Sequence, residues 1–338
     1  MVILGMLVLM QFLFSSSMKT NINFISKLNR EEREAYLSSE LYKAVLKSYQ
    51  FSESFLNYLN EYNGAEFSDF SLIVFEEDLR PVCVFYAYAK EDYFGFYTEP
   101  AVMFQMTEDK AIQDRAFQLI VQKLESIWKE NNFRTFEFYE NQFLMDWFSN
   151  QMKEKQTWNR TYIDLTLDSG LIKANIRKSY KSLINWGERN IEMILVDSRN
   201  ADSVLFSKFR EFHVAVAGKQ TRSDRSWDLQ FEAILKNQAF ACFGFFESQL
   251  VSANYILLGA EDAFYGVGVY DRRLMAEKKP IAHYPLYFSI MHAKQIGIKL
   301  FNLGVLNRAQ NEKEEGINHF KLGFSKTTDV RKSFLVNL

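Results

Sequence analysis

The order of the apolar segments constrains the fold of this chain more than any other feature, because one pattern occurs twice. In each copy, three short strand-like runs separated by turns precede an amphipathic helix and a fourth strand-like run. The first copy has these runs at 71–75, 81–89, 93–97, 110–130 and 133–139. The second copy has them at 240–246, 250–258, 263–269, 284–296 and 298–303. Because a helix between two strands of one sheet is a crossover connection, we predict a mixed α/β fold with two tandem lobes.

Segments outside the two copies are mainly helical in pattern. We expect helices over 28–60, 168–189, 203–217 and 227–237, and a short strand over 191–196. The second of these helices carries a basic face made of Lys173, Arg177, Lys178 and Lys181. We place the N-terminal lobe at 18–165 and the C-terminal lobe, which holds the site, at 166–338.

The first seventeen residues form a separate leader, 1–17. Val2 to Phe14 is apolar except for Gln11. A signal peptide has a positively charged segment before its apolar core, and no Lys or Arg precedes this one. A membrane-spanning helix needs about 20 apolar residues. We therefore expect translation to start at Met18 and the protein to be cytoplasmic, or peripheral to the inner face of the membrane. A membrane anchor is the second interpretation and a cleaved signal the third.

Composition excludes several classes of function. The net charge of −2 gives no bulk attraction to nucleic acid, so we expect no DNA partner, and a local basic cluster must hold any anionic ligand. Cys83 and Cys242 lie in apolar runs and are expected to be small buried side chains, with no disulfide framework and no metal site. The chain has no P-loop, no GxGxxG after a strand, and no GxSxG, HExxH or CxxC motif.

The segment 221–228, TRSDRSWD, is the first polar cluster of the C-terminal half. Arg222 and Arg225 offer planar guanidinium groups that match carboxylates and phosphates. Trp227 offers a flat surface for a sugar or a base. The alternative is a solvated loop in which Trp227 anchors the next helix.

The segment that follows 263–269 is the second cluster, and it leads into a helix that begins near His283 and Tyr284. The free N–H groups at the start of that helix attract anions. The alternatives are a charged surface loop and a structural role for His283.

The third cluster is GINHFKLGFSKT, residues 316–327. Aromatic residues Phe320 and Phe324 flank Lys321. A partly desolvated lysine has a lowered pKa or holds an anion strongly. The alternative is a surface lysine whose aliphatic part lies along the protein.

Four stretches of the C-terminal half resemble the FemAB group of acyltransferases, which are built from two GNAT-type (N-acetyltransferase) lobes. They are 175–196 (NIRKSYKSLINWGERNIEMILV), 253–271 (ANYILLGAEDAFYGVGVYD), 283–304 (HYPLYFSIMHAKQIGIKLFNLG) and 316–324 (GINHFKLGF). The resemblance covers about residues 165–335. Asn302 stands where an acid is common in the family, and the coiled-coil arm of the tRNA-dependent members has no counterpart here.

The resemblance implies transfer of an acyl or aminoacyl group to an amine of a cell-envelope or surface-polysaccharide precursor. Acyl-CoA or aminoacyl-tRNA would be the co-substrate, without a metal. The partner would be a small-molecule or lipid-linked saccharide acceptor, with tRNA if the donor is an aminoacyl-tRNA. By position in the family, Arg177, Lys178 and Lys181 would hold acceptor phosphates or carboxylates, and Lys321 would lie at the transfer site.

Taken together, these interpretations define the expected site. The catalytic candidates are Lys321 and His283, and we expect Arg177, Lys178, Arg222 and Lys321 to converge into one positive site. The substrate-binding candidates are Arg177, Lys178, Lys181, Arg222, Arg225, Trp227, Tyr255, Tyr270 and Tyr284. Two other functions remain open: an acetyl-CoA-dependent N-acetyltransferase for small molecules, and a ligand-binding protein without enzymatic activity.

Overall fold

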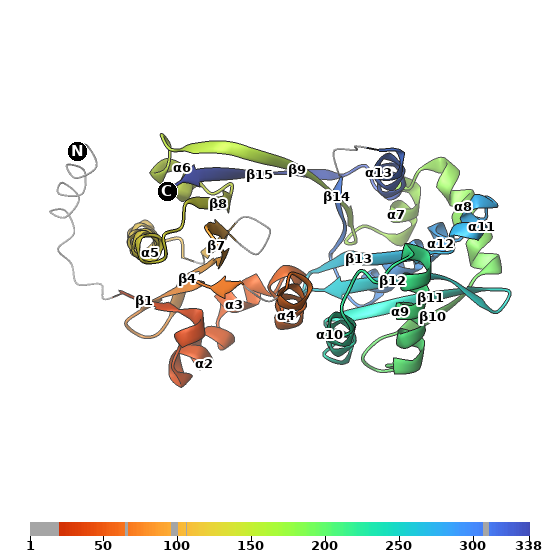
Figure 1. Ribbon diagram of the computed structural model, residues 1–338, viewed down its shortest axis with the longest axis horizontal. Coiled ribbons are helices and arrows are strands. Elements are labelled where there is room, and N and C mark those ends of the chain that lie inside the picture. The colour runs from red at the N-terminus through yellow and green to blue at the C-terminus, as the bar shows by residue number, and fades with distance from the viewer. Residues whose placement is uncertain (1–19, 65–66, 96–100, 106, 307–310) are drawn as a thin grey trace. The chain divides into compact units, whose positions relative to one another are not determined.

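Strands that pair as hairpins, followed by a helix and a parallel strand, recur along the chain in the computed structural model shown in Figure 1. The structure describes residues 20–64, 67–95, 101–105, 107–306 and 311–338. The leader 1–17 and the expected start at Met18 lie outside these residues. Within them, no helix is both long enough and apolar enough to cross a membrane. Both cysteines are buried and free, as expected.

The contacts divide the chain into two units that differ from the expected lobes. Unit 1 comprises Met1–Lys43, Ser68–Glu137 and Asn337–Leu338, and unit 2 comprises Ala44–Phe67 and Phe138–Val336. Residues 44–67 and 138–165, which the sequence placed in the N-terminal lobe, therefore belong to unit 2.

Unit 1 contains the first copy of the repeated pattern. Its elements are β1 (Thr20–Phe24), η1 (Ile25–Lys27), α2 (Arg30–Ser38), the start of α3 (Glu40–Val45), β2 (Ser68–Asp69), β3 (Leu72–Glu76), β4 (Pro81–Tyr86), β5 (Tyr88–Lys90), β6 (Tyr93–Gly95), β7 (Val102–Gln105), α5 (Lys110–Asn131) and most of β8 (Thr135–Tyr139). Strands β3 and β4 are antiparallel, β5 and β6 are antiparallel, and β6 pairs in parallel with β8 after the crossover helix α5. The Asp109 side chain caps α5, which buries one apolar face against the strands.

The single helix expected over 28–60 is divided into α2, α3, η2 (Tyr49–Phe51) and α4 (Glu53–Tyr62). Serine residues stand at the breaks. Ser48 and Ser52 have extended backbones, and their side chains accept hydrogen bonds from the first turns of η2 and α4. A serine side chain that bonds nearby N–H groups favours a helix start over a helix interior, so the long helix does not form.

Unit 2 contains the second copy and the remaining helices. Beyond η2 and α4, its elements are α6 (Gln142–Trp147), β9 (Met152–Asp164), α7 (Ser169–Asn175), α8 (Lys178–Asn190), β10 (Glu192–Val196), α9 (Ser203–Ala217), α10 (Asp224–Leu235), β11 (Ala239–Phe246), β12 (Gln249–Leu258), β13 (Asp262–Tyr270), α11 (Arg272–Ala276), α12 (His283–Gln295), β14 (Leu300–Leu306), α13 (Glu312–Phe324) and β15 (Thr328–Asn337). The strand order is β10-β11-β12-β13-β14-β9-β15. Neighbours are antiparallel except β13 and β14, which the crossover helix α12 connects. A parallel strand pair joined by a crossover helix therefore occurs in both copies. The strand order differs from the expectation, because β3 and β4 lie in a separate sheet, β1-β3-β4-β7, from β5, β6 and β8, whereas β11 to β14 lie in one sheet.

Alternate residues of the unit 2 strands enter two separate cores. Phe240 and Cys242 of β11 pack with residues of α8, α12 and α13, whereas Ala241 and Phe243 pack with residues of α9 and α10. Because successive strand residues point to opposite faces of a sheet, these two sets of helices cover opposite faces. Figure 1 shows α9 and α10 beside the strands β11 to β13.

Strands β13 and β14 pair over only three positions and then separate. The pairs join Asp262–Phe264 of β13 to Leu300–Asn302 of β14. Beyond them β13 continues to Tyr270 and β14 to Leu306, and β13 has a register shift opposite Tyr255 and Ile256. We call the place where the two strands diverge, after Phe264 and Asn302, the fork. A parallel pair that separates leaves backbone groups on its inner edges unpaired by the sheet.

Candidate active site

Lys321 of α13 reaches the fork. Its Nζ donates a hydrogen bond to the carbonyl oxygen of Val305, at 2.8 Å. A Cβ on Gly304 would lie 3.3 Å from this Nζ and 3.4 Å from a ring carbon of Phe264, and Gly304 has a φ of 90° that favours glycine. Burial without a carboxylate partner lowers the pKa of Lys321 to about 8. The fork therefore holds an ammonium group that is largely removed from water.

An aromatic cluster lies beside this lysine. The His283 ring, at the first position of α12, lies 4.4 Å from the Tyr180 ring and 5.4 Å from the Phe320 ring. Its Nδ1 is buried and has no hydrogen-bond partner among the described residues. Desolvation lowers the pKa of His283 to about 4, so the imidazole is neutral at pH 7.

Arg177 lies at the other edge of this cluster. Its backbone N–H donates to the carbonyl of Gly323 at 2.8 Å, and its Nη1 donates to Nε2 of His319 at 2.6 Å. Its guanidinium carbon lies 5.0 Å from the centre of the Tyr180 ring. His319 and Lys321 are two residues apart on α13 and so point to different sides of the helix. Arg177 and Lys321 consequently flank the aromatic cluster.

The other basic residues of α8 extend this edge. Arg177 is the N-cap residue of α8, and its side chain accepts no hydrogen bond from the first turn, whereas its carbonyl accepts from the N–H of Tyr180 at 2.9 Å. Lys178 is exposed at the first helical position, and Lys181 donates to the carbonyl of Ala174 at 3.0 Å. Both the dipole and the side chains make this end of α8 positive.

Tyr270 and Tyr284 occupy different surroundings. The Tyr270 ring lies 6.3 Å from the Phe320 ring, and its hydroxyl bonds the hydroxyl of Tyr265 at 2.6 Å. Tyr284 lies against α8, where a Cβ added to Gly187 would overlap the Cβ of Tyr284. Tyr270 therefore belongs to the fork, and Tyr284 belongs to the contact between α8 and α12.

Arg222 does not converge with these residues, in contrast to the expectation from the sequence. Its Nε donates to the hydroxyl of Tyr58 at 3.1 Å and its Nη1 donates to Nε2 of His213 at 2.9 Å. Its guanidinium also lies 5.6 Å from the Trp227 ring, in the core formed with α9 and α10. Because that core is on the opposite face of the sheet, Arg222 links α4 to α10 and contributes no charge to the fork.

Three more expected binding residues have structural positions. Trp227 and Tyr255 are only 3% and 1% exposed, and the Tyr255 hydroxyl donates to the carbonyl of Gln230 at 2.9 Å. Arg225 is exposed and pairs with Glu232 at 2.6 Å. The sequence could not distinguish these positions from binding positions, because they depend on which face of the sheet Tyr255 meets and on how α10, which carries Arg225 and Trp227, packs against the sheet.

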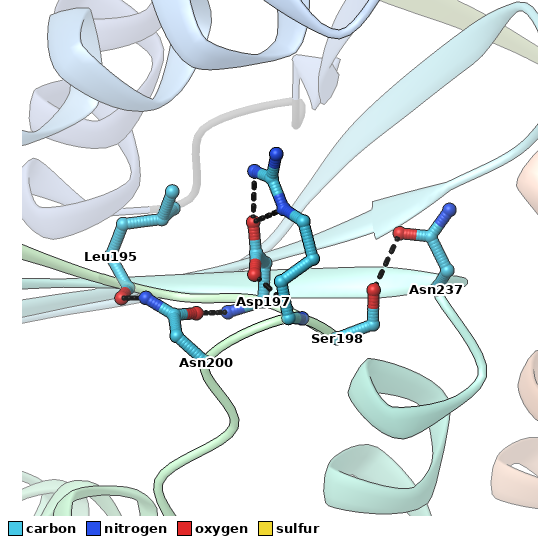
Figure 2. A network of polar contacts seen from close by, with 6 residues as sticks. Leu195, Asp197, Ser198, Asn200 and Asn237 are labelled. Carbon is cyan, nitrogen blue, oxygen red and sulfur yellow. Dashed lines mark hydrogen bonds and ion pairs between the residues drawn. The ribbon is translucent and has the colours of Figure 1, made fainter.

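A cavity of about 640 Å³ lies at the opposite end of the same strands. Its lining includes Asp197, Arg199, Asn237 and His292, and none of the expected site residues. Figure 2 shows the polar network at its rim, where Arg199 pairs with Asp197 at 2.5 Å and Ser198 donates to Asn237 at 3.1 Å. These bonds hold the turn between β10 and α9.

The sequence analysis missed Tyr265 at the fork, Tyr180 in the aromatic cluster, and the hydrogen-bonded pair Asn254 and Ser289. Of these, only Tyr265 was signalled, by its place directly before the GVG segment 266–268. Among the described residues, no group of three or more His, Cys, Asp and Glu side chains could hold a metal ion.

Comparison with solved structures identifies the fold. No protein-family profile and no curated protein matches the chain in sequence. The crystal structure of FemX is similar, with 10% identity, a TM-score of 0.63, and coverage of 92% of this chain and 97% of that chain. L-PGS from Bacillus licheniformis is similar with 13% identity, a TM-score of 0.55, and coverage of 91% of each chain. A tandem GNAT protein from the clavulanic acid biosynthesis pathway is similar with 10% identity, a TM-score of 0.51, and coverage of 94% of this chain and 98% of that chain. The chain therefore has the FemX-like fold of two tandem GNAT-type lobes, each a mixed sheet with a crossover helix.

Proposed function

We propose that this protein is an N-acyltransferase that moves an acyl or aminoacyl group onto an amine of a cell-envelope or surface-polysaccharide precursor. The observation that carries the proposal is the desolvated ammonium of Lys321 at the fork, beside Gly304 and the aromatic cluster. The likeness in fold to FemX and to a tandem GNAT protein supports the same class of reaction.

The reaction needs a donor for the oxygen that becomes negative. The amine nitrogen bonds to the acyl carbon, the bond from that carbon to the leaving group breaks, and one amine proton ends on the leaving group. In between, the carbonyl oxygen carries negative charge, which a positioned donor stabilises. Lys321 uses one N–H on Val305 and keeps two N–H groups for this oxygen. A charged donor in a site with little water is worth more than the same donor in water.

Arg177 and the start of α8 suit the anionic part of the acceptor. A sugar precursor that carries phosphates or carboxylates offers charges to Arg177 and Lys178, while its amine reaches the fork. The net charge of −2 makes this local cluster the feature that attracts such a ligand.

The surroundings of α12 favour an aminoacyl ester over acyl-CoA as the donor. A CoA pyrophosphate would need free N–H groups at the start of this helix. There, Pro285 lacks an N–H, Tyr284 packs against Gly187, and Ile281 and Ala282 are buried. These features leave little room for a pyrophosphate at this helix end.

A paired transfer assay tests the proposal. The full chain is incubated with a peptidoglycan precursor that carries a free amine, and either aminoacyl-tRNA or acetyl-CoA is added. We expect mass spectrometry to show the amide product with aminoacyl-tRNA only. A product with acetyl-CoA alone would support the small-molecule acetyltransferase, and binding of the precursor without any product would support the non-enzymatic alternative.

The matched variants Lys321→Met and Lys313→Met separate the role of the site from a general charge effect. Lys313 is an exposed lysine on the same helix. We expect loss of activity in the first variant only. Equal activity in both variants would remove Lys321 from the reaction.

A further inference from the structure

Four side chains form a line of hydrogen bonds that begins inside α12 and ends at the fork. Ser289 Oγ bonds the carbonyl of Pro285 at 2.9 Å, and Asn254 Nδ2 bonds Ser289 Oγ at 3.4 Å. Tyr270 bonds Asn254 Oδ1 at 2.9 Å, and Tyr265 bonds Tyr270 at 2.6 Å. Asn254 and Ser289 are fully buried, whereas the two tyrosines are half-buried.

The direction of every proton in this line follows from its first member. A backbone carbonyl only accepts, so the single hydroxyl proton of Ser289 goes to Pro285. Ser289 Oγ must then accept from the amide nitrogen of Asn254, which turns the amide oxygen of Asn254 toward Tyr270. Tyr270 therefore gives its proton to Asn254, and its oxygen must accept the proton of Tyr265.

The end of the line is consequently an acceptor. The proton of Tyr265 is committed to Tyr270, so the Tyr265 oxygen presents only lone pairs to anything outside the line. A Cβ on Gly268 would overlap this hydroxyl, which shows that the ring lies across the exposed Gly268 on β13. Tyr265 and Phe264 are neighbours on β13 and point to opposite faces of the sheet, so Tyr265 packs in the core formed with α8, α12 and α13, the helix that carries Lys321.

We infer that Tyr265 Oη accepts a hydrogen bond from the N–H of the acceptor amine and points the nitrogen lone pair toward the acyl carbon. Tyr265 is then a catalytic residue that touches substrate, and Tyr270, Asn254 and Ser289 are positioning residues that act through it. Burial raises the pKa of the Tyr265 hydroxyl, so it orients the amine as a neutral phenol and does not remove its proton. The assignment of an amine, rather than another N–H donor, rests on the proposed function.

The ammonium of Lys321 and the neutral hydroxyl of Tyr265 then have separate tasks. Lys321 donates toward the oxygen of the acyl group, and Tyr265 accepts from the attacking nitrogen. A hydrogen-bond donor and an acceptor held on two sides of one fork fit the two ends of the bond that forms.

A titration of the full chain, with tyrosines isotope-labelled at Cζ, tests the inference without any need for turnover. The Tyr265 signal is assigned by its loss in Tyr265→Phe. Ethylamine, which has only donors when protonated, and acetate, which has only acceptors, are the two probes. We expect the Tyr265 signal to shift with ethylamine and not with acetate, and the same pair of titrations in Lys321→Met removes effects of acetate bound to the lysine.

A second variant tests the direction of the line. In Tyr270→Phe the Tyr265 proton loses its acceptor, so we expect Tyr265 to begin to respond to acetate. In a transfer assay the same variant should raise KM for the amine by about 3- to 10-fold, the equivalent of one neutral hydrogen bond, with KM for the acyl donor unchanged.

Each result has one meaning. A wild-type Tyr265 signal that shifts with acetate but not ethylamine, or with neither probe, overturns the inference. A shift with ethylamine in a protein that transfers no acyl group from either donor class preserves the amine subsite and refutes the proposed function. Acyl transfer by a protein whose Tyr265 signal does not shift with ethylamine supports the proposed function and refutes the amine subsite.

Discussion

Burial destabilises the charged form of Lys321, so the protonation state of this residue should affect both the activity and the free energy of unfolding. In the unfolded chain its pKa is near 10.5, and in the folded chain it is about 8. Between these values the unfolded chain binds the extra proton, so the free energy of unfolding rises with pH over this window. The ammonium that the proposed reaction uses is lost over the same window, so stability and activity should change in opposite directions.

We predict that Lys321→Met lowers kcat/KM by about 10- to 100-fold at pH 7, the equivalent of one charge-assisted contact of about 1.5–3 kcal/mol. In wild type, kcat/KM should fall as the pH rises through about 8. Urea unfolding from pH 7 to 10.5 should show a rise in stability that the variant lacks. A wild-type rate that is constant to pH 10 would contradict the role given to the ammonium.

His283 titrates on the acid side of neutrality. Desolvation holds its pKa at about 4 in the folded chain, against 6.5 when unfolded. As the pH falls from 6.5 to 4, His283 becomes protonated in the unfolded chain but stays neutral in the folded chain. The free energy of unfolding therefore falls over this window, by up to about 3 kcal/mol.

We predict that His283→Phe, which keeps an aromatic ring against Tyr180 and Phe320, removes this loss. The difference in unfolding free energy between variant and wild type should grow as the pH falls from 6.5 to 4. A difference for His283→Phe that stays constant over this pH range would show that the imidazole is solvated.

At the scale of elements, one buried carboxylate is among the contacts that attach the segment 44–67 to the second copy of the pattern. Asp262, at the start of β13, accepts from the N–H of Tyr49 at 2.8 Å and from the hydroxyl of Ser48 at 2.9 Å. The Tyr49 ring is stacked on Phe264 at 4.7 Å. Burial outweighs these hydrogen bonds and raises the pKa of Asp262 from 3.8 to about 6.

We predict that Asp262→Asn stabilises the protein at pH 7, by up to about 3 kcal/mol, because it keeps one acceptor for Tyr49 and removes the buried charge. The folded chain binds the proton of Asp262 more tightly, so its contribution is present below pH 3.8 and lost as the pH rises through about 6. The gain from the variant should therefore vanish near pH 4. Destabilisation at pH 7 would instead mean that the two hydrogen bonds need the charged group.

The elements that the sequence predicted best are those whose apolar residues are most regular. Strands β11, β12 and β13 begin and end within one residue of the expected ranges, since long apolar runs end at clear turns. Strands β9 and β15 were not predicted, because their sequences mix charged and polar residues with apolar ones and many of their side chains are exposed. They pair with each other, so backbone pairing rather than an apolar pattern defines them.

For the candidate site, local sequence was sufficient for some residues and not for others. Aromatic neighbours marked Lys321, and the helix start marked His283. Register was needed for the rest. The shift opposite Tyr255 and Ile256 lies between Tyr265 and Tyr270, whose hydroxyls meet at 2.6 Å although the residues are an odd number apart on one strand, and no local pattern encodes such a shift.

For the whole chain, the net charge of −2 gives no sign that Arg177 and Arg222 have different surroundings and different roles. Arg177 lies beside the fork with His319 and the start of α8, where no carboxylate among the described residues pairs with it. Arg222 lies on the opposite face of the unit 2 sheet, between the rings of Tyr62 and Trp227. Composition and spacing treat these two residues alike, and only the division of the strands into two cores separates them.

We predict that this separation appears as two different phenotypes. Arg177→Ala should lower binding of an anionic acceptor by about tenfold or more, since one charge-assisted contact is lost, and should change stability little. Arg222→Ala should leave acceptor binding unchanged and destabilise the fold by about 1–2 kcal/mol, because Tyr58 and His213 lose their shared partner. Arg225→Ala, which breaks only an exposed ion pair, is the control for both measurements. Calorimetric titration with a nucleotide-linked amino sugar and urea unfolding of the same three variants give the comparison. If Arg222→Ala weakened acceptor binding as much as Arg177→Ala without loss of stability, the acceptor would extend across both faces, and the fork could not be the only place where this protein meets its substrate.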